Sequence, residues 1–138
     1  MKERKILFFA ILLFIGAVSH AQPRGHFDPE RFQADLERHV IGAAQLTEAE
    51  CAKFLPLYRQ MRKQQITLMQ QRRQLRTSRN AAAVIRTQDQ IDIRLKKLQQ
   101  QYHERFLKVL PAEKVLKIIK AEDAFHRKAF KNAHPHDN

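Results

Sequence analysis

Several residue types are scarce in this chain of 138 residues, and each shortage excludes a class of structure. Cys51 is the only cysteine, so no disulfide can form within the chain. Its place on an apolar helix stripe favours a small buried residue, and an intermolecular disulfide is the alternative. There are only three glycines and no tryptophan. This composition favours helix over sheet, and no glycine-rich phosphate loop or strand pattern is present.

Long apolar runs are also rare, and the one that occurs lies near the start of the chain. A basic segment, Met1 to Lys5, precedes the almost wholly apolar residues 6–18, and small residues follow at Ser19 and Ala21. This layout is typical of a secretory signal peptide over residues 1–21. A membrane anchor is the alternative, but the run is shorter than the roughly 20 residues that a spanning helix needs. We therefore expect export, with a single domain over residues 22–138.

Apolar residues recur at helical spacing along most of that domain and predict an all-α fold with four helices. The expected bounds are residues 28 to about 45, 47 to about 76, 81 to 109, and 110 to about 131. The second and third helices should each be roughly 40 Å long. Because a short turn at 77–80 joins them, with Ser78 or Asn80 as a cap, they should form a long antiparallel hairpin.

The spacing also predicts which residues face the core. In the first helix these are Phe32, Leu36, Val40 and Ala43. The stripe of the third helix is Val84, Gln88, Ile91, Leu95, Leu98, Tyr102, Arg105 and Val109. In the fourth helix the apolar face is Val115, Ile118, Ile119, Phe125, Ala129 and Phe130. A chain of this size drawn into long helices leaves apolar stripes exposed, so we expect a homodimer.

The second helix opens on a clear start signal at Leu46, Thr47 and Glu50. The Thr47 hydroxyl can accept a bond from a free N–H of the first turn, and the Glu50 side chain can reach back to the Thr47 N–H. Together they form a capping box, and Leu46 stands where an apolar residue can pack the entering chain against the helix. The signal is structural and does not by itself indicate a function.

This segment resembles the small periplasmic all-helical proteins of the Spy/CpxP kind, whose mark is a Leu-Thr-x-x-Gln motif that occurs twice. Residues 46–50, Leu-Thr-Glu-Ala-Glu, match the first copy, with Glu50 in place of Gln. Residues 110–114, Leu-Pro-Ala-Glu-Lys, stand where the second copy belongs but lack both Thr and Gln. Residues 46–58 are also similar to a segment of proteins described as sensors of extracytoplasmic-function sigma factors.

The resemblance implies a periplasmic, cradle-like subunit of four helices, usually an antiparallel dimer. It implies ATP-independent chaperone activity on unfolded or acidic envelope proteins. The alternative is an envelope-stress or metal sensor that binds a membrane-bound regulator or a sigma-factor system. No nucleophile motif or catalytic carboxylate pair is present, so we do not expect an enzyme.

Acidic residues are missing from a long stretch that covers most of the second helix, the hairpin turn and the start of the third helix. Residues 53–88 contain no Asp or Glu. The same stretch holds nine basic residues: Lys53, Arg59, Arg62, Lys63, Arg72, Arg73, Arg76, Arg79 and Arg86. A face kept only for solubility usually mixes signs, so we interpret this stretch as a surface that attracts acidic clients. Such a run often indicates nucleic acid, but export and the lack of a nucleic-acid motif argue against that partner. They favour unfolded envelope proteins or anionic lipid surfaces instead.

Histidines near the C-terminus are weak candidates for a metal site. They are His126, His134 and His136. Imidazoles bind divalent transition metals, but a site needs three or four converging ligands, and these residues lie in or near a short tail. We therefore expect no cofactor, with a transition metal as the alternative.

Overall fold

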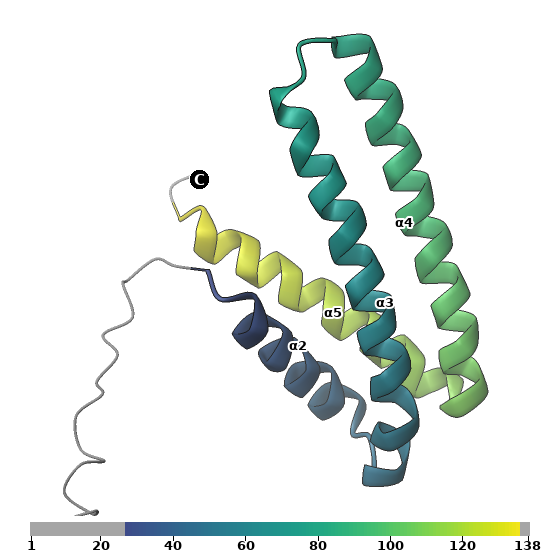
Figure 1. Cartoon of the computed structure of the whole chain (residues 1–138). Coiled ribbons are helices and arrows are strands. Elements are labelled where there is room, and N and C mark those ends of the chain that lie inside the picture. The colour runs from purple at the N-terminus through teal and green to yellow at the C-terminus, as the bar shows by residue number, and fades with distance from the viewer. Residues whose placement is uncertain (1–26, 136–138) are drawn as a thin grey trace, which may run out of the picture. The chain divides into compact units, whose positions relative to one another are not determined.

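The computed structural model describes residues 27–135, and all regular structure within that range is helical. The elements are α2 (Pro29–Ala44), α3 (Glu48–Gln74), the short 3-10 helix η1 (Leu75–Thr77), α4 (Ala81–Val109) and α5 (Ala112–Ala133) (Figure 1). The all-α fold with four long helices is therefore confirmed. The predicted signal peptide lies outside the described residues. The chain divides into two units, Met1–Glu30 and Arg31–Asn138, and the packing discussed below lies within the second.

Side-chain caps fix where the two longest helices begin. The Thr47 hydroxyl accepts a bond from the Glu50 N–H at 3.2 Å, and the Glu50 carboxylate accepts one from the Thr47 N–H at 3.0 Å. The predicted capping box is therefore confirmed. At the start of α4, Asn80 Oδ1 accepts a bond from the Ala83 N–H at 3.1 Å, which identifies Asn80, and not Ser78, as the cap.

Helices α3 and α4 run side by side in opposite directions, as the hairpin prediction requires, and α2 and α5 lie beside one end of the pair (Figure 1). We call this the four-helix end. Beyond Gln65 in α3 and before Leu98 in α4, Ile91 is the one described residue that is buried. The remainder of the hairpin is thus two helices without further cover in the described chain.

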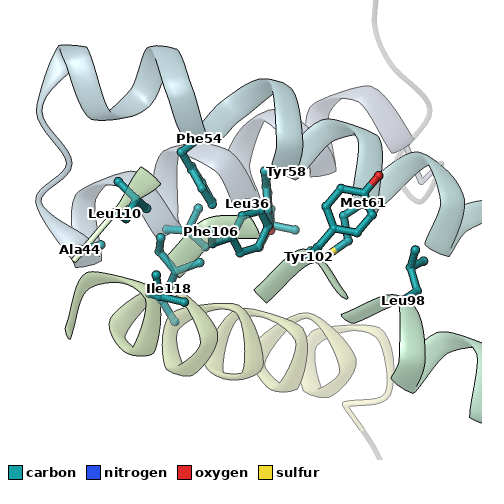
Figure 2. Close-up of a cluster of buried hydrophobic side chains, with 13 residues drawn as sticks. Leu36, Ala44, Phe54, Tyr58, Met61, Leu98, Tyr102, Phe106, Leu110 and Ile118 are labelled. Carbon is teal, nitrogen blue, oxygen red and sulfur yellow. The ribbon is translucent and has the colours of Figure 1, made fainter. Parts of the chain in front are cut away.

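The core of the four-helix end is built around three aromatic rings (Figure 2). The Phe54 ring centroid lies 5.1 Å from that of Tyr58 and 5.0 Å from that of Phe106. The Tyr58 hydroxyl donates a hydrogen bond to Glu122 of α5 at 3.1 Å, so the one polar atom of this cluster is satisfied. Around the rings lie Leu36, Val40, Ala44, Met61, Leu98, Tyr102, Leu110, Val115, Ile118 and Ala121.

Three residues depart from the predicted core faces. Ala44, not Ala43, is buried in α2, and Phe106, not Arg105, is buried in α4. The 4-3 repeat predicts one narrow seam, whereas α4 packs against more than one helix at its C-terminal end. Tyr102 and Phe106, four residues apart, therefore share the buried face. Phe130 was assigned to the apolar face of α5 but is 65 % exposed.

Within residues 27–135, no helix combines the length and the apolarity needed to cross a membrane.

Candidate functional site

The two segments that carry the family resemblance meet in space. Lys114, at the first turn of α5, donates a hydrogen bond to Glu50 Oε1 with an N–O distance of 2.6 Å. The same ammonium group donates to the Gln45 carbonyl oxygen at 3.1 Å. The bond from Lys114 to Glu50, with that from the Thr47 N–H, lowers the pKa of Glu50 below its usual value. The α2–α3 turn is thus joined to the start of α5.

This contact gives a physical reason for the two residues that replace the glutamines of the Leu-Thr-x-x-Gln motif. Glu50 and Lys114 occupy the positions at which the motif has its two glutamines, and here they form an ion pair. At this half-buried position, a carboxylate or an ammonium group without a partner would be a partly desolvated, unpaired charge. The ion pair neutralises both charges. Sequence reasoning gave no role to Lys114, although its opposite charge at the matching motif position was the available signal.

Within residues 27–135, the nine predicted basic residues separate into six that are exposed and unpaired, two that form ion pairs, and one that is buried. Those that are exposed and make no ion pair with any described residue are Lys53, Lys63, Arg73, Arg76, Arg79 and Arg86. Arg59 forms a bidentate pair with Glu37 of α2 at 2.8 and 2.9 Å, which lowers the pKa of Glu37. Arg72 pairs with Asp92 across the hairpin at 2.9 Å.

Arg62 differs from the rest because it is only 8 % exposed. Its guanidinium donates to Gln65 Oε1 at 2.8 Å and to Gln33 Oε1 at 3.3 Å, which links α3 to α2. Arg62 is therefore a buried member of the predicted basic stretch, and its side chain lines one of the two grooves between the helices. A long apolar stem and five donors allow such a residue to be buried where neighbouring amide oxygens accept its bonds.

Two grooves flank α3 just beyond the aromatic core. The first, of about 290 Å³, lies between α2 and α3 and is lined by Gln33, Arg59, Arg62, Lys63, Ile66 and Thr67. The second, of about 400 Å³, lies between α3 and α4 and is lined by Gln64, Thr67, Leu68, Arg94, Lys97, Leu98 and Gln101. Neither lining includes a carboxylate. Each groove therefore presents cations and amides around apolar side chains.

Sequence reasoning missed two of the five cations that line these grooves. Arg94 and Lys97 come from α4, beyond the end of the acid-free stretch, and Asp89 and Asp92 precede them. Only the antiparallel pairing of α3 and α4 brings them opposite Gln64 and Leu68. The helical spacing of Arg94, Lys97 and Gln101, which places them on one face of α4, was the signal that could have found them.

Apolar side chains lie exposed along the same hairpin. They are Ile66 (40 %), Met69 (43 %), Ile85 (60 %), Ile93 (55 %) and, at the C-terminal end of α4, Leu107 (43 %). Among the apolar residues that the sequence placed between the basic ones, Phe54 and Met61 are buried in the core, whereas Ile66 and Met69 face solvent. A partner can therefore contact Ile66 and Met69, but not Phe54 or Met61.

The two histidine candidates within the described residues contact different partners. His126 is half-buried, and its Nδ1 lies 2.8 Å from the carbonyl oxygen of Glu122. His134 is exposed, and its ring stacks on Phe130 with centroids 4.6 Å apart. Within the described residues no group of three or more potential ligands is brought together. His136 lies outside the described range.

Comparison with models of known families, with curated proteins and with solved structures finds no match to this chain. The resemblance to the Spy/CpxP proteins therefore stays a hypothesis that depends on residues 46–58 and 110–114.

Proposed function

We propose that this is a periplasmic, ATP-independent, chaperone-like protein that binds unfolded or acidic clients along the α3–α4 hairpin. The observation that carries the proposal is the lining of the two grooves, in which cations border apolar side chains and no carboxylate is present. Unfolded proteins expose apolar side chains next to their charged ones, and this lining matches both features for acidic clients. The resemblance at residues 46–50 supports the same function.

Each component of the grooves has a separate part in binding. Lys63, Arg94 and Lys97 have no ion-pair partner among the described residues, so their field is available to attract a carboxylate from solution. Ile66 and Leu68 then offer apolar area for the client's exposed side chains. Met69, flexible and 43 % exposed, can adapt to clients of different shape. Charge would set the rate of capture, and apolar contact would set the rate of release.

The test is an aggregation assay with an acidic client diluted from denaturant. In the groove variant, Lys63, Arg94 and Lys97 are replaced by Gln. The matched control replaces Lys117, Lys120 and Lys128 of α5 by Gln, which removes the same charge from residues that line neither groove. We expect capture by the groove variant to be slower by roughly tenfold at low salt, whereas the control should resemble wild type.

Salt provides an independent check, because screening shortens the reach of exposed charges from about 8 Å to about 3 Å between physiological and 1 M salt. Wild-type capture should slow toward that of the groove variant as salt rises. If the groove and control variants slow capture equally, the grooves are not the binding surface. If wild type fails to suppress aggregation even in excess over the client, the chaperone proposal itself is wrong.

A further inference from the structure

The end of the hairpin has a composition that the grooves do not share. Residues 70–88, here called the tip, contain five arginines and no Lys, Asp or Glu. Residues 89–131 contain eight lysines and three arginines. Residues 22–52 also carry arginine without lysine, but they include Asp and Glu, whereas the tip combines arginine with the absence of both lysine and acidic residues. A need for positive charge in general does not explain the choice of arginine there.

The tip is the projecting end of the molecule's long hairpin. It comprises the last turn of α3, η1, the turn to Asn80 and the first turns of α4 (Figure 1). None of its residues is buried. Neither groove reaches it, since the residues that line the grooves lie within 33–68 and 94–101. A projecting, unburied end suits contact with a broad surface better than enclosure of a peptide.

Four of the tip's arginines are open to such a contact. Arg73, Arg76, Arg79 and Arg86 are exposed and have no ion-pair partner among residues 27–135, whereas Arg72 is held by Asp92. Ile85, in the second turn of α4, is 60 % exposed and lies beside Arg86 in sequence. The tip thus combines fixed positive charge with an apolar side chain that has no cover in the described chain.

Guanidinium groups bind phosphate oxygens in a bidentate manner and stay charged at any physiological pH. Basic residues near an anionic bilayer each strengthen binding by roughly fivefold, and an apolar side chain between them can enter the headgroup region. We propose that the tip docks on the phosphate headgroups of an anionic phospholipid membrane. Docking by the tip would leave both grooves free, so this proposal does not depend on the proposed function.

The test measures binding of the full-length protein to vesicles of phosphatidylcholine with phosphatidylglycerol, and to vesicles of phosphatidylcholine alone, by co-sedimentation. The tip variant replaces Arg73, Arg76, Arg79 and Arg86 by Gln. The control variant replaces Lys117, Lys120, Arg127 and Lys128 of α5 by Gln, with the same loss of charge. Residues 1–26 are identical in wild type and in both variants. A difference in vesicle binding between the tip variant and the control variant therefore reports the contribution of the tip.

We expect the tip variant to lose at least about a hundredfold in affinity for the anionic vesicles, and the control less than about fivefold. Unchanged far-ultraviolet circular dichroism of the tip variant would show that the fold is intact, as expected for unpaired surface charges. Equal losses for the two variants, or tighter binding of the tip to duplex DNA than to vesicles at the same salt, would overturn the proposal. Aggregation suppression without vesicles should be the same for the tip variant and wild type, which separates this test from that of the grooves.

Discussion

The register of α4 can be tested with substitutions of two neighbouring residues, Phe106 and Arg105. Phe106 is 1 % exposed, and its ring centroid lies 5.0 Å from that of Phe54 and 6.3 Å from those of Tyr58 and Tyr102. Phe106→Ala removes these contacts and leaves a cavity between helices that cannot fully collapse. Substitutions of this kind lower the free energy of unfolding by about 3–5 kcal/mol.

Arg105 is exposed, and its guanidinium carbon lies 4.8 Å from the ring centroid of Tyr102. Loss of an exposed cation–π contact costs about 0.5–1 kcal/mol. The structure therefore predicts that Phe106→Ala destabilises the protein by at least about 2 kcal/mol more than Arg105→Ala does. The sequence pattern placed Arg105, and not Phe106, in the stripe that faces the core. It therefore does not predict a larger loss of stability for Phe106→Ala than for Arg105→Ala.

The assay is urea unfolding followed by circular dichroism, at one protein concentration because self-association would couple stability to concentration. With a slope near 2 kcal/mol per molar urea, Phe106→Ala should lower the midpoint by about 2 M and Arg105→Ala by about 0.5 M or less. Equal shifts, or a larger shift for Arg105→Ala, would show that the side-chain register of α4 is not the one described.

Two further predictions concern single contacts. Thr47→Ala should lower the free energy of unfolding by about 1 kcal/mol through loss of the cap, and an unchanged urea midpoint would contradict that role. The pKa of Glu37 is held below its usual value of 4.5 by Arg59, so this pair stabilises the fold above that pH and its contribution is lost as the pH falls through the folded-state pKa. The urea midpoints of wild type and Arg59→Gln should therefore differ at neutral pH and converge in acid. If the urea midpoints of the two proteins still differ at low pH, the Arg59–Glu37 ion pair is not the source of the difference.

Local signals in the sequence predicted the helices well. Thr47 and Glu50 define the start of α3 because a capping box involves residues three apart, and the bonds it needs are local. The hairpin followed from two long periodic segments and a short turn, and Asn80 was one of its two predicted caps. These features depend on neighbours in the chain, which the sequence displays directly.

Several features that depend on a second helix were missed, because the sequence shows which residues share a helix face but not which residues of another helix they meet. Arg62 is identical in kind to the arginines around it, and only the approach of Gln33 from α2 makes it a buried residue. Glu50 and Lys114 are 64 residues apart in the sequence, so no local pattern predicts their ion pair. The second groove needs Arg94 and Lys97 opposite α3, and this alignment is set by the geometry of the hairpin.

The uneven packing of the hairpin has a consequence for how the molecule unfolds locally. At the four-helix end, α3 and α4 are held by α2, α5 and three aromatic rings, whereas toward the tip Ile91 is the last buried side chain of the described chain. Local opening costs little where few apolar contacts are broken. Amide hydrogens should therefore exchange with solvent fastest near Asn80 and more slowly, turn by turn, toward Phe54 and Phe106. The hairpin can thus fray from its far end while the aromatic core stays folded.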